Sequence, residues 1–176
     1  MNMHGMPLGL LTGLCRPADI VGFEWLDDPQ HNIPKLKPER LVYVGLRDVD
    51  HAEKVMLKQL GITAFTMRDI DKFGIAHVMD LAMAQLAPSA EAPLHVSFDI
   101  DAVCPTWAPA TGTTVAGGLS FREANYVTEA VAETGALGSL DMVEVNPTLG
   151  QLHEDATKTA DLGNMLITSM LGDSII

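Results

Sequence analysis

The chain has 176 residues, which suits one domain or part of one. Its 23 acidic and 11 basic side chains give a formal net charge of −12, which argues against nucleic acid or an anionic membrane as a partner, because both need basic patches. The only cysteines, Cys15 and Cys104, lie far apart, which excludes a disulfide scaffold and a Cys-x-x-Cys zinc site and favours a reducing compartment.

The apolar segment 7–14 does not read as a signal peptide, because no Lys or Arg precedes it and glycine and proline interrupt it. No apolar run approaches the roughly 18 to 20 residues that span a bilayer. We therefore expect a cytoplasmic protein without a membrane partner.

Apolar patterning predicts strands that alternate with helices from residue 41 onward. Strands are expected over 41–46, 62–67, 95–101 and 138–145, and helices over 51–60, 70–86, 120–133 and 154–171. Ser120 and Glu123 form a capping-box pattern at the start of the third of these helices. Residues 27–39 and 102–118 are expected to be loops. This alternation predicts an α/β fold with a largely parallel sheet.

Three of the predicted strands end in acidic residues, at Asp48 and Asp50, at Asp99 and Asp101, and at Glu144. Ligands of open parallel sheets bind beyond the carboxyl ends of the strands. The three acidic ends therefore predict one crevice at a single edge of the sheet.

Asp99 and Asp101 are two residues apart, so in a strand they would face the same side, roughly 6.5 Å apart along the backbone. Two carboxylates that close repel one another, and a divalent cation such as Mg, Ca or Mn would relieve the repulsion. The alternative is a pair of loop-entry aspartates that cap backbone amides.

Glu144 lies inside an apolar run, where a glutamate is rarely buried without a partner. It could bind a cation, and a guanidinium fits best because its planar fork matches a carboxylate. It could equally form a structural pair with Arg47 or Arg122. His4 could shuttle protons, although a histidine this close to the terminus is more often solvated.

Six motifs together, in this order and spacing, resemble arginases of the ureohydrolase family. They are Asn2-Met3-His4-Gly5-Met6-Pro7, Gly45-Leu46-Arg47-Asp48-Val49-Asp50, Ser97-Phe98-Asp99-Ile100-Asp101, Pro109-Ala110-Thr111-Gly112-Thr113, Gly117-Gly118-Leu119-Ser120-Phe121-Arg122-Glu123 and Asp141-Met142-Val143-Glu144-Val145-Asn146-Pro147. The resemblance covers essentially the whole chain. The Phe-Arg-Glu, Glu-Val-Asn-Pro and His-Gly-Met-Pro versions of these motifs favour arginase over agmatinase.

The resemblance implies a three-layer α-β-α fold with a two-manganese centre, in which a metal-bridging hydroxide attacks the guanidinium carbon of L-arginine to yield ornithine and urea. The site residues that it implies fall into three groups. The metal ligands are Asp99 and Asp101; the groups that act in the reaction are His4, Asp101 and Glu144; and the groups that contact substrate are Asn2, Asp50, Glu53, Thr113 and Glu144. Arg122 and Glu123 match a subunit contact of trimeric members, so the resemblance also implies a homotrimer.

Two departures from the family pattern qualify these expectations. Cys104 stands where the family usually has aspartate, which places a soft thiol near the metal ligands. The other four metal ligands of the family lie upstream of the match to residues 2–5, so residues 1–176 are expected to form the carboxyl-terminal part of one domain, with the N-terminal half absent. In the family's strand order, an absent strand separates the first two strands of this chain from its last two.

The resemblance therefore predicts arginase chemistry only when the absent half is present. Two alternatives stay open: a ureohydrolase of the agmatinase type, and a non-catalytic relative that acts in binding or regulation.

Overall fold

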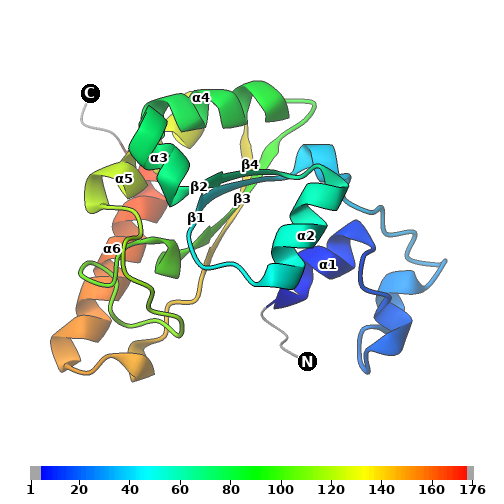
Figure 1. The fold of residues 1–176 in the computed structure, drawn as a ribbon, viewed down its shortest axis with the longest axis horizontal. Helices are drawn as coiled ribbons and strands as arrows, with labels where there is room; N and C mark the ends of the chain where they lie inside the picture. Colours follow the sequence, from blue (N-terminus) through cyan, green and yellow to red (C-terminus); the bar gives the residue numbers. More distant parts are fainter. Residues whose placement is uncertain (1–4, 174–176) are drawn as a thin grey trace.

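The computed structural model describes residues 5–173, in which helices and strands alternate along the chain (Figure 1). The elements are α1 (Pro7–Thr12), β1 (Val42–Leu46), α2 (His51–Leu60), β2 (Thr63–Thr66), α3 (Met67–Phe73), α4 (Ile75–Leu86), β3 (Leu94–Asp99), α5 (Phe121–Glu133), β4 (Leu137–Val143) and α6 (His153–Met170). Short 3-10 turns lie at η2 (Pro17–Asp19), η3 (Glu24–Asp27), η4 (Pro38–Arg40), η5 (Ile100–Ala102) and η6 (Pro147–Leu149).

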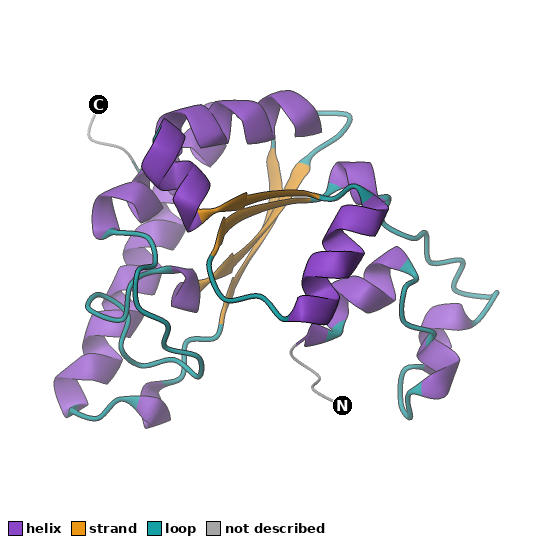
Figure 2. Cartoon of the chain, viewed as in Figure 1, coloured by secondary structure: helices purple, strands orange, loops and turns teal. Residues whose placement is uncertain are grey.

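The four strands form two separate parallel pairs, β1 with β2 and β3 with β4 (Figure 2). Parallel pairing agrees with the sequence-based expectation, but the single sheet expected from strand–helix alternation is divided into two. This division is what the resemblance implied, since an additional strand was expected between the two pairs.

The hydrophobic core lies where β3 meets the helices α4, α5 and α6. Its most deeply buried side chains include Val78 of α4, Val131 of α5 and Leu166 of α6. By contrast, every residue of β2 is only partly buried, and α2 has no buried residue. In Figure 1 the strands run between α5 and α6 on the left and α1 and α2 on the right, so the tight core lies on the left.

One predicted helix is divided in two. The apolar spacing predicted a continuous helix over 70–86, but the structure ends α3 at Phe73 and starts α4 at Ile75. Gly74 between them has φ 81° and ψ 151°, which is not helical. Glycine adopts such a conformation at little steric cost, so a glycine within an apolar repeat became a helix boundary.

The carboxyl ends of two strands also differ from the prediction. β3 ends at Asp99, and Asp101 lies in the turn η5 rather than in the strand. β4 ends at Val143, so Glu144 follows the strand instead of lying within it. Both acidic groups are therefore held by the turns that leave the strands, which is the usual place for functional side chains in parallel sheets.

None of the helices within residues 5–173 combines the length and the apolar character that crossing a bilayer requires.

Candidate active site

The Asp99–Asp101 segment forms a tight turn at the end of β3. The Asp99 carboxylate oxygen Oδ1 accepts a hydrogen bond from the Asp101 backbone N–H at 3.0 Å, which caps η5. The capping alternative weighed from the sequence is therefore seen for Asp99. The argument that two strand residues share a face does not hold, because Asp101 lies beyond the strand; the turn brings the two carboxylates close instead.

Charge is disfavoured at both aspartates. Burial raises the pKa of Asp99 to about 6, the nearby charges of Asp101 and Glu144 add to the rise, and the Asp101 N–H opposes it. Burial also raises the pKa of Asp101, with Glu144 acting in the same direction and the Arg47 guanidinium against it. Asp99, Asp101 and Glu144 thus form one electrostatic cluster. The sequence predicted that three acidic strand ends would meet at one edge, and this is seen for the ends of β3 and β4.

Glu144 follows β4 with an unusual backbone conformation. Its φ of 64° lies in the left-handed region, which a residue with a Cβ rarely adopts. Its Oε2 lies 3.8 Å from the place that a Cβ on Gly112 would occupy, so the loop before α5 passes beside its carboxylate. Non-glycine residues in this region cost about 1–3 kcal/mol and cluster at functional sites.

The loop beside Glu144 is anchored from two sides. The Ala110 N–H donates to Thr159 Oγ1 of α6 at 2.9 Å, and the Asn146 N–H donates to the Ala110 carbonyl at 3.0 Å. The hydroxyl of Thr111 is buried and has no hydrogen-bond partner among residues 5–173. Thr113, the predicted substrate-contacting threonine, is exposed two residues further along the same loop.

Asp50 and Glu53 lie together at the start of α2. Glu53 Oε2 accepts from the Asp50 N–H at 3.1 Å, and the two form a capping box. Both are exposed, and Glu53 contributes to raising the pKa of Tyr43, after burial. A Cβ on Gly5 would lie 3.8 Å from Glu53 Oε1, so the beginning of the described chain approaches this helix end.

Two predicted site residues, Asn2 and His4, lie outside the described residues. The predicted subunit-contact pair is divided between two environments: Arg122 is exposed, whereas Glu123 is half-buried and its Oε2 accepts from the Ser120 N–H at 2.8 Å. The Ser120–Glu123 capping box predicted from the sequence is confirmed.

Cys104 lies on the loop that leaves the Asp99–Asp101 turn. Its Sγ is 3.5 Å from Thr106 Oγ1. Hydrogen bonds from the backbone and hydroxyl of Thr106, together with the backbone N–H groups of Gly117 and Gly118, lower the pKa of the thiol. The thiol therefore lies in surroundings that accept a negative charge, as they would for the aspartate usual in the family.

The carboxylate oxygens of Asp99 and Asp101 could form part of a metal site. Asp99 and Asp101 offer the hard oxygen ligands that Mn and Mg accept, and a cation would relieve the repulsion that raises their pKa values. Within residues 5–173, however, no three His, Cys, Asp or Glu side chains are close enough together to hold one ion. The described chain thus fits two carboxylate ligands rather than a complete shell.

A hollow on the described chain lies elsewhere. It has a volume of about 770 Å³ and is formed by α6 with Trp107 and Phe121. None of the three clustered carboxylates lines it. The electrostatic cluster, not the hollow, is the better candidate for chemistry, because its residues converge at strand ends and two of them, Asp99 and Asp101, have raised pKa values.

Comparison with known proteins identifies the family to which this chain belongs. A model described as the Arginase family matches residues 1–172. The chain belongs to the arginase family. It is 49% identical over 175 residues to the arginase of Coccidioides immitis and 47% identical over 176 residues to that of Neurospora crassa, and in each case 99% of the chain is covered. The matches cover 52% and 48% of those two proteins, so the chain spans about half the length of the curated relatives that it matches.

Solved arginase structures agree in fold. The Bacillus caldovelox enzyme matches with a TM-score of 0.85 at 36% identity, over 99% of this chain and 55% of that one. The Entamoeba histolytica arginase, whose structure contains L-ornithine, matches with a TM-score of 0.81 at 27% identity, over 97% and 53%. The arginase-like α/β fold predicted from the resemblance is confirmed.

Sequence reasoning missed one side chain that the structure places at this edge. Arg47 follows β1, and its guanidinium donates to the main-chain carbonyls of Asp101 and Val115. From the sequence, Arg47 was a possible ion-pair partner of Glu144 or Asp48, with no role in holding main-chain carbonyls. An arginine directly after an apolar strand, among three acidic strand ends, was the signal available for a larger role.

Proposed function

We propose that this chain contributes to an arginase that hydrolyses L-arginine to L-ornithine and urea, and that it is active only together with the part of the protein that its relatives have and this chain does not span. The observation that carries the proposal is the Asp99, Asp101 and Glu144 cluster at the strand ends of a chain belonging to the arginase family. The predicted homotrimer and cytoplasmic location remain predictions.

Asp99 and Asp101 would supply carboxylate oxygens to a centre of two Mn²⁺ ions. Manganese, when bound, supplies an activated water and a template for substrate. The charge repulsion between the two aspartates supports this role, because a cation removes it. Asp101 would also relay a proton.

Glu144 would bind the guanidinium of arginine. A carboxylate and a guanidinium form charge-assisted hydrogen bonds, which are roughly twice as strong as neutral ones. The anchored loop beside Glu144 would place Thr113 against the same part of the substrate.

The amino-acid end of the substrate would be recognised by Asn2, Asp50 and Glu53, and His4 would protonate the leaving amine. The capping box fixes Asp50 and Glu53 at the start of α2, beside Gly5. This neighbourhood supports the assignment for Asp50 and Glu53, since acidic groups attract a substrate ammonium.

Other amidine hydrolases are the runner-up substrate class. Proclavaminate amidino hydrolase of Streptomyces clavuligerus matches with a TM-score of 0.61 at 25% identity over 77% of this chain, against 0.85 at 36% for the Bacillus caldovelox arginase. The closer likeness to arginases supports arginine as the substrate.

The test compares the 176-residue chain with a fusion in which it replaces the matching part of the Coccidioides immitis arginase. We expect the chain alone with added Mn²⁺ to release no urea from arginine, because two carboxylates cannot hold both ions, and we expect the fusion to release urea. Arginase-level turnover by the chain alone, or a folded fusion that binds Mn²⁺ yet hydrolyses agmatine and not arginine, would contradict the proposal.

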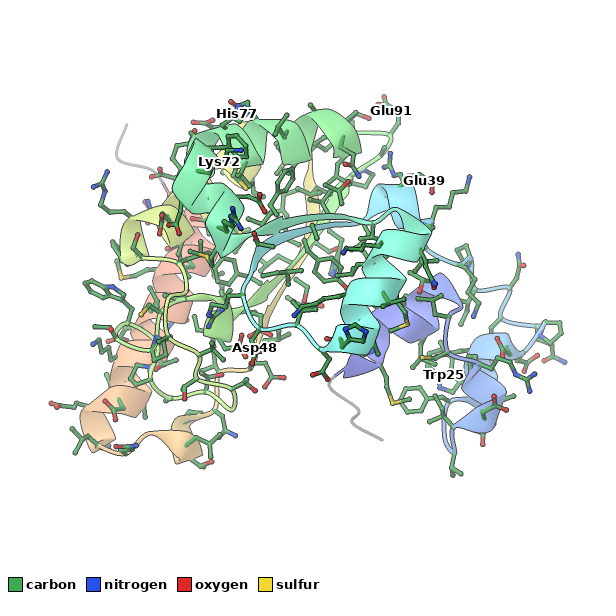
Figure 3. All side chains as sticks on the ribbon, in the orientation of Figure 1. Trp25, Glu39, Asp48, Lys72, His77 and Glu91 are labelled. Atoms are coloured by element: carbon green, nitrogen blue, oxygen red, sulfur yellow. The ribbon has the colours of Figure 1, made fainter. Side chains whose placement is uncertain are left out.

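A matched pair of variants in the fusion separates ligands from neighbours. Asp101→Asn should lower manganese content and turnover more than Asp48→Asn, because Asp101 belongs to the electrostatic cluster, whereas Asp48 is exposed in the segment after β1 (Figure 3). Equal loss of manganese in the two variants would contradict the assignment of Asp101.

A further inference from the structure

Arg47 joins the two parallel pairs at the edge where the carboxylates gather. It directly follows β1, whereas both of its acceptors follow β3: the carbonyl of Asp101 in η5 and the carbonyl of Val115 in the loop before α5. Its Nε and Nη2 lie 3.0 and 2.9 Å from the Val115 oxygen, and Nη2 also donates to the Asp101 oxygen. β1 and β3 are not paired, so no backbone hydrogen bonds of a sheet join them. The Arg47 side chain provides a polar connection between the two pairs.

The backbone before Arg47 is shaped for this connection. Gly45 is buried at φ 89°, and the β1–β2 register shifts between Val44 and Leu46. A Cβ at Gly45 would lie 3.8 Å from the side chain of Leu119, a residue at the end of the same loop that Arg47 holds. The irregularity thus lets the end of β1 approach the β3 loops closely.

The Asp101 carbonyl is part of the turn that sets the two carboxylates. The N–H of Asp101 donates to Asp99, while the carbonyl of Asp101 accepts from Arg47, so the residue is held from both sides. A planar guanidinium can hold two carbonyls in a fixed geometry, which a lysine ammonium does only as a point charge.

We propose that Arg47 is a positioning residue that fixes the Asp99–Asp101 turn and the loop through Val115, and so sets the separation of the two carboxylates. The part of this proposal that concerns metal affinity rests on the proposed function; the part that concerns the turn does not. In this proposal Arg47 contacts neither metal nor substrate.

The test uses the full 176-residue chain without metal and follows amide hydrogen exchange at Asp101 and Leu119 by NMR. The Leu119 N–H donates to the Ala102 carbonyl and so reports on the loop. Arg47→Met should accelerate exchange at both amides by about tenfold or more, since hydrogen bonds to charged groups are the stronger ones. Arg40→Met is the matched control, because Arg40 also donates to a carbonyl, that of Leu86 at 3.2 Å, but precedes β1.

Exchange at the wild-type rate in Arg47→Met, or equal acceleration in Arg40→Met, would overturn the proposal. If Arg47→Met does not fold, Arg47→Lys is judged by the same criterion against Arg40→Lys, because a lysine keeps the charge and loses the fork.

A second measurement is one that a merely structural role would not change: the affinity of the folded fusion for Mn²⁺, measured by electron paramagnetic resonance of the free ion. We expect Arg47→Met to weaken it about tenfold and Arg40→Met to leave it unchanged, by the same bond-strength argument. Faster exchange with unchanged affinity would overturn the positioning of the carboxylates. A fusion without the Arg47 change that binds no Mn²⁺ would contradict the proposed metal site instead, and exchange at Asp101 would then decide the role of Arg47 alone.

Discussion

Asp99 is a carboxyl group that the fold partly buries next to two further carboxylates. Its pKa is raised from 3.8 to about 6, so the folded chain binds its proton more tightly than the unfolded chain does. The resulting stabilisation is complete below about pH 4 and is lost as the pH rises through about 6. This direction is opposite to that of a salt-bridged aspartate.

We therefore expect Asp99→Asn, which resembles the protonated form, to stabilise the metal-free chain at pH 7 and to lose this advantage progressively as the pH falls towards 4. The measurement is the difference in melting temperature between variant and wild type across that range. A difference that stays constant with pH would contradict the raised pKa. The metal-free condition matters, because a bound cation would favour the ionised form.

Glu144→Gln in the fusion described above should leave manganese content nearly unchanged and reduce turnover of arginine sharply, as the proposed function requires. Glutamine keeps the size of the side chain but not the charge that pairs with a guanidinium. Removing one partner of a desolvated pair costs about 2–5 kcal/mol, or roughly 30- to several-thousand-fold in kcat/KM.

The alternative for Glu144, a structural pair with Arg47 or Arg122, predicts a lower melting temperature with near-normal kcat/KM. Manganese stoichiometry, melting temperature and kcat/KM measured on this one variant therefore separate the two roles. Near-normal kcat/KM would remove Glu144 from the site.

At the residue scale, the sequence predicted which acidic groups lie at the strand ends, but not the local backbone structure that holds them. The Asp99–Asp101 pair was expected on one face of a strand, yet a turn holds it, because strand length is not encoded by alternation alone. The left-handed φ of Glu144 and the carbonyl bonds of Arg47 depend on segments that are distant in sequence, which a local pattern cannot reveal.

Individual elements were predictable where a local signal marks their ends. Helix α5 begins after Ser120, whose Oγ accepts from the Glu123 N–H at 3.3 Å, and α2 ends before Gly61 at φ 65°. The division between α3 and α4 was missed, because a single glycine within an apolar repeat is compatible with both a helix and a break.

The cap of α5 gives a direct test of element stability. Ser120→Ala should lower the free energy of unfolding by about 0.5–2 kcal/mol, since it removes the acceptor for an otherwise unpaired N–H. Ser120→Asp keeps an acceptor and is the matched control, so its stability should stay near that of wild type. Chemical denaturation of both variants measures the difference, and equal loss in the two would show that the cap is not the cause.

At the scale of the whole molecule, the notable property is the division into two parallel pairs. Parallel sheets are normally buried on both faces, but β2 here is only partly buried throughout. The family resemblance anticipated this division; the composition and periodicity of the chain did not, because strand order is set by long-range pairing. The α/β class itself followed from the alternation of elements.

Open edges should make the isolated chain associate with itself. Strands without a second partner offer unpaired backbone groups, and each two-stranded pair has such an edge on both sides among residues 5–173. We expect sedimentation velocity to show growing oligomers as the concentration rises, despite the net charge of −12. The fusion described above is the control and should show less association; a chain that stays monomeric at every concentration would contradict the prediction.

The segment between Val103 and Leu119 is a loop whose two ends are already joined. The Cys104 N–H donates to the Leu119 carbonyl at 2.9 Å, the Leu119 N–H donates to the Ala102 carbonyl at 2.9 Å, and a Cβ on Gly118 would lie only 2.5 Å from that same oxygen. These hydrogen bonds already hold the two ends of the loop together, so they compensate the entropic cost of closing it. Each doubling of loop length would add only about 0.6 kcal/mol to that cost. Relatives can therefore differ in the length and sequence of the exposed part of this loop while the junction, and the aspartates beside it, stay where they are.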